Sequence, residues 1–532
     1  MTAAESSLAL PIATIPLNGE AGTEAGQGAL GLTFCPGAND PMIGKDHCMR
    51  DLASDLASVR AWGASALVTL LDEHEFDLLN VPDLGEMAES AGLDWYHLPI
   101  PDMASPGWIF ERRWVYAGLR LRRLLRRGGR VVIHCRAGLG RSGTIAARLL
   151  IELGAAPGQA IERVRAARPG AIQNSEQERH VMQTRAIPPT IDEAVSRRLS
   201  CLLGGALGDG FGYVVEFDSL ASIKEMHGPA GLREPYFHQG NLVVSDDTQM
   251  SLFSLEGLTR AMLNGDPGDQ TLVDQVRLSY LDWLATQDPR TEGGNQASRL
   301  LKHAAMHAQR APGRTCMNAL IQGAGGTPER PINDSKGCGG VMRTGVVGLM
   351  PNMTPARAFR IGARIAALTH GHPSGYLSAG LMAAAVRGLL EDLPLHTALI
   401  QAAGLAREWS GHEETLVLLN TALNQAIRPF TGVLPAVLGE GWVGEQALAI
   451  AVYAASSSQS FQEVMAIAAN HSGDSDSTAS LAGQLFGAEH GLEALPHGWI
   501  RRLDILKAGL DLADWCLPLW ARTMRPDFSL PA

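Results

Sequence analysis

A double proline at Pro188-Pro189 separates two parts of the chain whose hydrophobic patterns belong to different fold classes. Before it, short β-branched apolar runs alternate with helix-like segments, which predicts α/β organisation. After it, strand-like runs become rare, and Ala- and Leu-rich segments with helical periodicity dominate. In this chain of 532 residues we therefore expect an α/β domain over residues 25–187 and an all-α domain over residues 196–530. The predicted strands cover residues 66–71, 95–98 and 130–135. The clearest predicted helices cover residues 145–153, 356–368, 380–390, 396–409 and 444–455.

The composition argues against several function classes. A net charge of −11 argues against general binding of nucleic acid. No stretch reaches the roughly 18 apolar residues that a membrane-spanning helix needs. Residues 1–28 lack the basic and apolar regions of a secretory signal. Seven scattered cysteines without a Cys-x-x-Cys pair fit a reducing compartment better than a disulfide framework or a zinc site. We expect a cytoplasmic protein that binds neither nucleic acid nor a membrane.

The strand predicted at 130–135 ends in a cysteine that a glycine-containing loop and an arginine follow. Backbone N–H groups of such a loop, a helix N-terminus and a guanidinium all favour an anion and lower a thiol pKa. We predict that Cys135 attacks phosphate as a thiolate, that Arg141 binds two phosphate oxygens, and that Ser142 hydrogen-bonds the sulfur. Asp102, in a proline-stiffened segment, is the candidate general acid. The predicted phosphate-binding loop is Arg136, Ala137, Gly138, Leu139, Gly140 and Arg141.

The pattern Cys-x5-Arg-Ser resembles the cysteine-dependent protein phosphatases, most closely the kinase-associated members of the dual-specificity branch. Three further segments carry this resemblance, at residues 30–37, 97–102 and 168–173. It implies an α/β cysteine-phosphatase fold and phosphorylated proteins as partners. Two alternatives stay open: a buried, inert cysteine at a strand end, and a mere rim charge for Arg136, which otherwise favours a strongly anionic substrate.

Two clusters of carboxylates and hydroxyls lie far apart in the second part of the chain. Each cluster alone fits an ordinary helix N-cap. Their joint occurrence with a Gly-Asp-Gly opening that leads to Glu216 favours a shared site. All candidate ligands are oxygens, which indicates a pair of hard cations, Mg²⁺ or else Mn²⁺. The clusters are Ser245, Asp246 and Asp247, and Asp474, Asp476 and Ser477.

These motifs, with the glycine loop at 337–343 and Thr369-His370-Gly371-His372, resemble the ADP-ribosylglycohydrolase family. The resemblance spans residues 197–520 and implies an all-α fold of that family. It implies that the six cluster residues hold two Mg²⁺ ions, with Ser at 245 and 477 where the family usually has Thr. Glu216 would be a ligand or a gate. The residues implied to contact ADP-ribose are Gly337, Gly339, Gly340, Met342, His370 and His372. The two histidines fit packing or N-cap roles equally well.

Together the motifs predict a bifunctional hydrolase that removes phosphate and ADP-ribose from modified proteins. The resemblance implies metal-assisted cleavage at C1″ of ADP-ribose, with one cluster carboxylate or Glu216 acting on the attacking water. Two alternatives stay open. Both sites could process a small phosphorylated ADP-ribose derivative, or the second domain could bind ADP-ribose without cleaving it and regulate the phosphatase.

Overall fold

The computed structural model describes residues 9–17, 19, 28–39, 50–263, 265–294 and 297–522. The chain divides into two compact units, with the boundary between Asp192 and Glu193. The ends predicted for the two domains at residues 25 and 530 lie outside the described residues. Within the described part, no helix is both long and apolar enough to cross a membrane.

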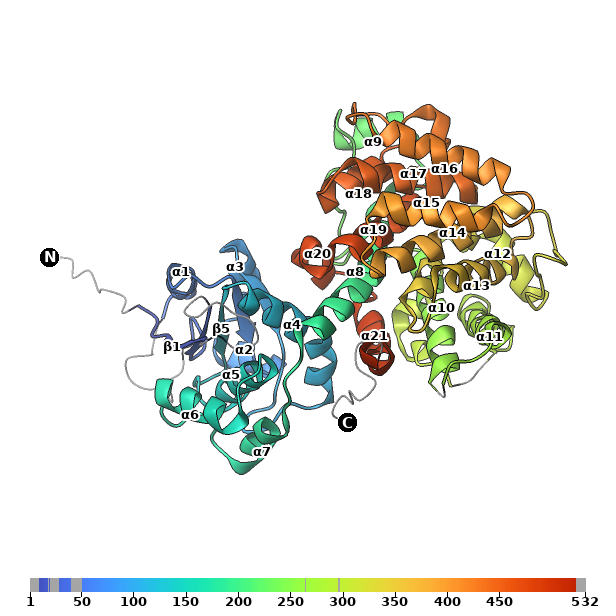
Figure 1. The fold of residues 1–532 in the computed structure, drawn as a ribbon. Coiled ribbons are helices and arrows are strands. Elements are labelled where there is room, and N and C mark those ends of the chain that lie inside the picture. Colours follow the sequence, from blue (N-terminus) through green and yellow to red (C-terminus); the bar gives the residue numbers. More distant parts are fainter. Residues whose placement is uncertain are drawn as a thin grey trace. The chain divides into compact units, whose positions relative to one another are not determined.

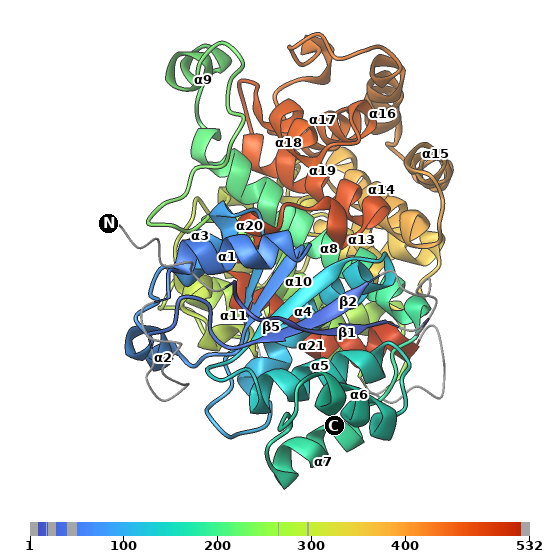
Figure 2. The same ribbon diagram turned by 90° about the vertical axis from the view of Figure 1, so that its left-hand side faces the viewer.

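The first unit contains a five-stranded sheet in the order β1-β2-β5-β3-β4. The edge strand β1 runs antiparallel to β2, and the other neighbours are parallel (Figures 1 and 2). The strands are β1 (Ala13–Pro16), β2 (Ala29–Thr33), β3 (Ala66–Thr69), β4 (Asp94–His97) and β5 (Arg130–His134). The helices are α1 (Leu52–Ala61), α2 (Glu73–Leu78), α3 (Leu84–Ser90), α4 (Trp108–Arg126), α5 (Gly140–Glu152), α6 (Pro157–Ala167) and α7 (Ser175–Gln183).

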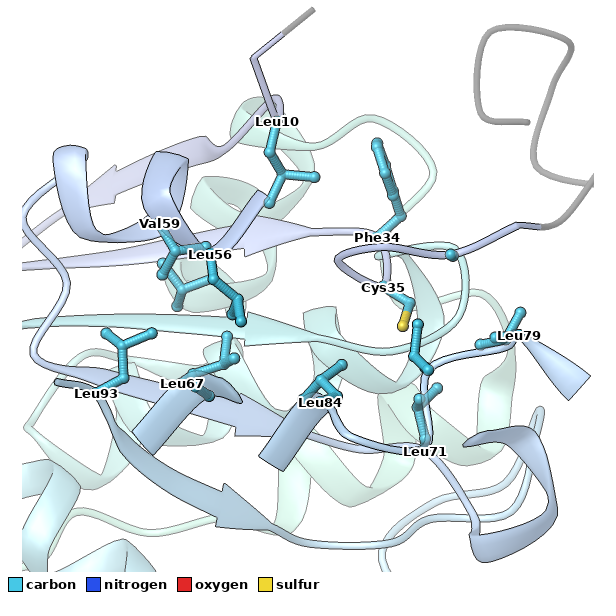
Figure 3. Packing of buried hydrophobic residues seen from close by; sticks show 14 of the residues in the cluster. Leu10, Phe34, Cys35, Leu56, Val59, Leu67, Leu71, Leu79, Leu84 and Leu93 are labelled. Atoms are coloured by element: carbon cyan, nitrogen blue, oxygen red, sulfur yellow. The ribbon is translucent and has the colours of Figure 1, made fainter. Parts of the chain in front are cut away.

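Apolar side chains between the sheet and its helices form the core of this unit. Leu56 of α1 and Leu84 of α3 pack with Leu67 of β3 and Val132 of β5 in one buried cluster (Figure 3). Helices α4, α5 and α6 contact the strands β5, β2 and β1. Strands β2, β3, β4 and β5 are parallel, so the loops at their carboxyl ends meet at one edge of the sheet. That edge is where α/β folds usually place a binding site.

The predicted α/β class is confirmed, and the three predicted strands are present with small shifts in their ends. Strands β1 and β2 lie outside the predicted set. β1 is a four-residue edge strand that ends in a proline, and β2 contains the unbranched residues Ala-Leu-Gly-Leu. β2 has only one β-branched residue, Thr33, and β1 has two but is short and ends in a proline, so neither shows the longer β-branched apolar run on which the prediction depended.

The second unit is helical, as predicted, and among its described residues it has only isolated bridges in place of strands. Helix α14 is buried along almost its whole length and contacts α13, α15, α17 and α19 (Figure 1). It is apolar on all sides, as expected for a helix at the centre of a core. The helices are α8 (Pro189–Gly212), α9 (Leu220–His227), α10 (Asp246–Met262), α11 (Asp269–Gln287), α12 (Arg314–Ile321), α13 (Pro355–Ala367), α14 (Pro373–Leu390), α15 (Leu395–Ala406), α16 (Glu413–Ala426), α17 (Gly444–Ser457), α18 (Phe461–Ala469), α19 (Ser475–His490), α20 (His497–Arg501) and α21 (Leu506–Arg522).

Candidate active sites

The loop between β5 and α5 turns its carbonyl groups away from a pocket. The carbonyl of Arg136 accepts from the N–H of Cys35 at 3.2 Å, and that of Leu139 accepts from Gly143 at 3.0 Å. The Arg168 guanidinium donates to the carbonyls of Ala137 and Gly138 at 3.2 and 3.3 Å. A planar peptide directs its N–H opposite to its C=O. The loop N–H groups are therefore directed away from these partners, as the predicted anion-binding loop requires.

Gly138 is required at the tightest point of this loop. Its φ of +71° lies in the left-handed region, and a Cβ there would lie 2.4 Å from the carbonyl oxygen of Thr33. Any side chain would therefore push the loop away from the end of β2.

Cys135 lies at the base of the pocket, at the carboxyl end of β5. Its Sγ is 3.5 Å from Oγ of Ser142, the partner that the sequence predicts. The preceding His134 is buried, and its Nε2 is 2.7 Å from Oγ1 of Thr69. Burial, together with the charge of Arg141, lowers the pKa of His134 to about 3. His134 is therefore neutral and holds the strand end in place without adding charge beside the sulfur.

The guanidinium of Arg141 is held by the carboxylate of Glu75 and lies beside Asp102, the candidate general acid, in the pocket. Glu75 accepts from its Nη1 and Nη2 at 2.5 and 2.8 Å. The carbonyl of Ile100 accepts from Nη1 at 3.0 Å. Oδ1 of Asp102 is 3.1 Å from Nη2, and the Asp102 side chain is 60% exposed. The predicted nucleophile loop, arginine and acid thus converge on one pocket.

The segment that carries Asp102 is tied to the start of α7. The carbonyl of Met103 accepts from Nδ2 of Asn174 at 2.8 Å, and that of Ala104 accepts from Nε2 of Gln177 at 3.2 Å. The pocket has a volume of about 480 Å³. Its lining comprises Pro11, Phe34, Asp102, Met103, Cys135, Arg136, Ala137, Leu139, Arg141, Arg168, Gln173 and Gln177.

In the second unit, the two acidic clusters lie at the starts of α10 and α19. Ser245 caps α10 by accepting from the N–H of Asp247 at 3.2 Å, and Asp474 caps α19 by accepting from the N–H of Ser477 at 3.2 Å. The hydroxyl of Ser477 donates to Oδ2 of Asp247 at 2.8 Å, across 230 residues of sequence. Both clusters therefore cap helices, and they also contact each other, while a shared cation site stays a prediction.

Helix α8 brings a further carboxylate to this place. Asp209 accepts from the N–H of Ser245 at 2.8 Å and from the N–H of Thr248 at 3.0 Å. Helices α8 and α19 approach closely through small residues, because a Cβ at Gly208 would lie 2.0 Å from the carbonyl oxygen of Ala479. This close contact places Asp209 beside the acidic clusters.

Burial and mutual repulsion raise the pKa values of this acidic group. Burial is the larger cause and Asp476 the next for Asp246, Asp247 and Asp474, whose pKa values lie well above the usual range. Burial also raises the pKa of Asp476. The pKa of Asp209 is raised to about 7, and that of Glu216 to about 10, again by burial and then Asp476. Among the described residues, Oε2 of Glu216 is buried without a hydrogen-bond partner.

This arrangement fits divalent cations as counter-charges. A group of buried carboxylates that repel one another, with an unpartnered oxygen among them, is stabilised by positive charge. Within the described residues, no group of three or more His, Cys, Asp or Glu side chains is placed so that it could hold a metal ion. The predicted donor set also contains the hydroxyls of Ser245 and Ser477, and members of this set hydrogen-bond one another.

The glycine loop around η7 (Cys338–Gly340) lies against the second acidic cluster. Sγ of Cys338 is 2.6 Å from Oδ2 of Asp474. Burial and the Asp474 carboxylate raise the pKa of this thiol well above its usual value. A Cβ at Gly339 would lie 3.1 Å from Cε1 of His370, so the loop rests directly on that ring, and Gly337 lies beside it.

Met342, His370 and His372 each make contacts within the fold. His370 is 1% exposed, and burial with the charge of Arg343 lowers its pKa to about 3. His372 caps α14, because its Nδ1 accepts from the N–H of Ser374 at 3.1 Å. Met342 is buried, and its carbonyl accepts from Nε2 of Gln484 at 3.0 Å. His370 is therefore packed in the core and His372 caps a helix, and contact of either with ADP-ribose stays a prediction.

Three residues at these sites are not among the site residues that the sequence predicts. Glu75 forms a capping box with Asp72 at the start of α2, and this pattern is its only signal in the sequence. Asp209 is the aspartate of the Gly-Asp-Gly opening at 208–210, and Cys338 lies in the glycine loop at 337–343, but the sequence alone predicts no role for either. Their roles depend on contacts with residues distant in sequence.

Comparison with known proteins finds similar proteins for both units of the chain. The sequence profile of the ADP-ribosylglycohydrolase family matches residues 190–526. The profile described as "Polymorphic toxin system, DSP-PTPase phosphatase" matches residues 44–155. Cyclin-dependent kinase inhibitor 3 of Rattus norvegicus is 30% identical over 164 residues, which cover 29% of this chain and 71% of that protein. The protein of the same name from Sus scrofa is 29% identical over 177 residues, covering 32% and 80%.

Two solved structures each match one part of this chain over most of their own length. An ADP-ribosylglycohydrolase-related protein complex is 24% identical, with a TM-score of 0.43, and covers 62% of this chain and 99% of its own. A kinase associated phosphatase is 25% identical, with a TM-score of 0.29, and covers 33% of this chain and 93% of its own.

Proposed function

This chain belongs to the ADP-ribosylglycohydrolase family, with a dual-specificity-type phosphatase domain ahead of it, and we propose that both domains are catalytically active. The first would hydrolyse phosphomonoesters of proteins through a cysteine nucleophile. The second would release ADP-ribose from modified protein side chains with the help of Mg²⁺ or Mn²⁺. The chain would therefore be a single bifunctional hydrolase with two chemically independent sites.

One observation carries the second activity. The hydrogen bond from Ser477 to Asp247 brings together two acidic clusters that the sequence separates by 230 residues. An ordinary pair of helix caps has no reason to share a buried position, because the carboxylates repel each other there. A site for divalent cations explains why both helices begin at this point.

In the phosphatase, each step can be assigned to a residue of the pocket. The Cys135 sulfur would attack phosphorus, so that an S–P bond forms while the bond from phosphorus to the leaving oxygen breaks. Asp102 would give its proton to that oxygen. Arg141 and the loop N–H groups would hold the phosphate oxygens. Water would then attack phosphorus and give its proton to the Asp102 carboxylate while the S–P bond breaks, and the Ser142 hydroxyl would stabilise the departing thiolate.

In the glycohydrolase, the two clusters would hold two cations through Ser245, Asp246, Asp247, Asp474, Asp476 and Ser477. When bound, the cations supply Lewis acidity, which orients hydroxyl groups and lowers the pKa of water. We assign the proton of the attacking water to Glu216 in its ionised form, which nearby positive charge favours, since its Oε2 is buried and has no hydrogen-bond partner among the described residues. The bond at C1″ of ADP-ribose would break through an oxocarbenium-like transition state.

A panel of three substrates tests this function. The purified chain is assayed with a phosphopeptide, with a protein ADP-ribosylated on arginine, and with ADP-ribose-1″-phosphate. We expect phosphate release from the first and ADP-ribose release from the second. Turnover of ADP-ribose-1″-phosphate alone would contradict the proposal and favour a small-molecule substrate.

A second assay separates catalysis from binding in the glycohydrolase unit. Release of ADP-ribose should vanish on chelation and in Asp246→Ala, while the chain still folds. Binding of ADP-ribose without any release by the intact, metal-supplied chain would show a regulatory binding module instead.

A further inference from the structure

Arginines outnumber acids in the lining of the phosphatase pocket. Arg136, Arg141 and Arg168 all line it. Among the described lining residues, Asp102 alone carries a negative charge. The guanidinium of Arg141 is matched by the buried carboxylate of Glu75, which accepts from both of its terminal nitrogens. The charges of Arg136 and Arg168 are therefore additional to the arginine that the proposed phosphate site uses.

Arg168 is held at the edge of the nucleophile loop by both its backbone and its side chain. Its N–H donates to the carbonyl of Val164 at 2.9 Å, and its carbonyl accepts from the N–H of Ala171 at 3.1 Å. Its Nε and Nη2 donate to the carbonyls of Gly138 and Ala137. Among the described residues, no carboxylate forms an ion pair with this guanidinium. Arg168 is half-buried, so its charge is fixed in place and still reaches solvent.

Arg136 lies next to this position, because it directly precedes Ala137, whose carbonyl Arg168 contacts. The carbonyl of Arg136 accepts from the N–H of Cys35 at 3.2 Å, which fixes the backbone here. Like Arg168, it is half-buried and lines the pocket. The two arginines therefore belong to neighbouring points of the pocket wall, where like charges together favour an anion.

The pocket is larger than one phosphoryl group requires. Its volume of about 480 Å³ lies within the roughly 300–1,000 Å³ that sites for whole small molecules have. Its lining also includes the apolar residues Pro11, Phe34 and Met103. A substrate can therefore place a second group in the pocket besides the phosphate under attack. Arginine suits a phosphate there, since its planar fork donates two parallel hydrogen bonds.

We propose that Arg136 and Arg168 form a second anion subsite, and that the preferred substrate is a phosphopeptide with a second phosphate close to the one removed. This inference rests on the proposed phosphatase function and names its substrate class. A phosphate ester carries about −1.5 to −2 charge at pH 7, more than a carboxylate offers to the two guanidinium groups. Because the subsite holds the neighbouring phosphate equally before and during the reaction, the gain should appear mainly in KM.

Two peptides that differ in a single phosphate test the subsite. Both contain phosphotyrosine, and a nearby serine is phosphorylated in only one of them. Release of the tyrosine phosphate by the full chain is measured. We expect kcat/KM to be about 10-fold higher for the doubly phosphorylated peptide, the low end of what a hydrogen bond to a charged group contributes. Raising the ionic strength from about 0.1 M to about 1 M should bring this ratio close to one, because the Debye length shortens from about 10 Å to about 3 Å.

Loss of either arginine should reduce this preference. Arg136→Gln and Arg168→Gln should each lower the ratio to about 3 or less. Both residues also belong to or contact the nucleophile loop, so the rates on both peptides should fall. The ratio is the readout that loop support alone does not change. Arg179→Gln is the matched control, since it removes the same charge from an exposed residue of α7 outside the pocket lining, and it should leave the ratio unchanged.

The outcomes separate this inference from the proposed function. Equal kcat/KM for the two peptides would overturn the subsite and leave the phosphatase intact. A ratio that survives in Arg136→Gln or Arg168→Gln, or that falls as far in Arg179→Gln, would do the same. Failure to hydrolyse either peptide would overturn the phosphoprotein phosphatase and the subsite together.

ADP-ribose-1″-phosphate supplies the other source of a second anion, because it carries a diphosphate besides its phosphomonoester. We expect a lower kcat/KM for it than for the doubly phosphorylated peptide. A higher kcat/KM would show that a small molecule occupies the subsite, and would overturn the assignment to a phosphopeptide.

Discussion

At the scale of single residues, the orientation of Arg141 depends on Glu75, a residue distant in sequence that the fold brings next to it. Its guanidinium forms a two-point ion pair with Glu75, and the two side chains are 2% and 3% exposed. Such a pair orients the arginine before substrate arrives, because rotation of the guanidinium would leave the Glu75 carboxylate buried and unpaired. Besides two backbone carbonyls, the guanidinium contacts the exposed Asp102, which also lines the pocket.

Glu75→Gln should therefore weaken the phosphatase without touching the nucleophile. We expect kcat/KM for p-nitrophenyl phosphate to fall by about 10²-fold, the size of effect that a misplaced positioning group produces. Loss of one partner of a buried pair should also destabilise the first unit by about 3 kcal/mol.

Steady-state kinetics and urea unfolding measure the two effects. Glu73→Gln on the same helix is the matched control, because the Glu73 side chain is 75% exposed. Equal rates in the Glu75 and Glu73 variants would show that the ion pair does not position Arg141.

Residues that belong to a recognisable motif were predictable, whereas partners such as Glu75 that lie outside any motif were not. Cys135, Arg141 and Ser142 form one contiguous motif, so the spacing alone indicated their site. Glu75 is 66 residues from Arg141 in sequence, and its local pattern indicates only a helix cap. The contact exists because the loops after β3 and β5 meet at the same sheet edge.

At the scale of elements, each acidic cluster was correctly placed at a helix start. Sequence alone could not establish that α10 and α19 start at the same point in space. The close approach of α8 and α19 helps to fix that point, and it depends on glycines facing backbone. Fold class followed from periodicity. Strand β1 is too short and ends in a proline, and β2 has only one β-branched residue, so neither was predicted.

Gly208→Ala tests the importance of this helix contact. The new Cβ would lie 2.0 Å from the carbonyl oxygen of Ala479, so α8 and α19 must move apart. Overpacking of this kind costs about 1–3 kcal/mol. Because Asp209 and the α19 cluster would shift with the helices, ADP-ribose release should fall by about 10²-fold.

Gly404→Ala on α15 is the matched control, since no atom lies within 4 Å of its added Cβ. It should stabilise the chain by about 0.5–1 kcal/mol, as expected for alanine in a helix. If both variants behaved alike in thermal unfolding and in ADP-ribose release, the close α8–α19 contact would not position the site.

Because the converging helix ends bury several carboxyl groups together, the stability of the chain should depend on pH when no metal ion is supplied. The folded pKa values of Asp209 and Glu216 are about 7 and about 10, above the values near 4 of an unfolded chain. Such groups stabilise the fold fully below the unfolded pKa, and this stabilisation is lost as pH rises through the folded pKa. With a chelator present, the melting temperature should fall as pH rises from about 5 to 8.

Mg²⁺ should remove most of this fall, because the cations offset the carboxylate charges. The measurement is the difference in melting temperature between Mg²⁺ and chelator as a function of pH. A difference that does not grow with pH would contradict cation binding at the carboxylate group.

At the scale of the whole molecule, the two proposed sites share no residue and would use different chemistry. The proposed cysteine mechanism needs no metal, and the proposed glycohydrolase mechanism needs no nucleophilic thiol. Chelation should therefore abolish ADP-ribose release and leave phosphate release unchanged within about 2-fold. Parallel assays of one chelated sample on both substrates measure this. Equal loss of both activities would indicate a coupled site.

The most direct test of two independent catalytic sites is a cross-comparison of two variants on two substrates. Cys135→Ser should lower phosphopeptide hydrolysis by at least about 10³-fold, the scale of losing a covalent nucleophile, and leave ADP-ribose release intact. Asp246→Ala should do the reverse. If either variant lost both activities while remaining folded, the account of two independent sites would be wrong.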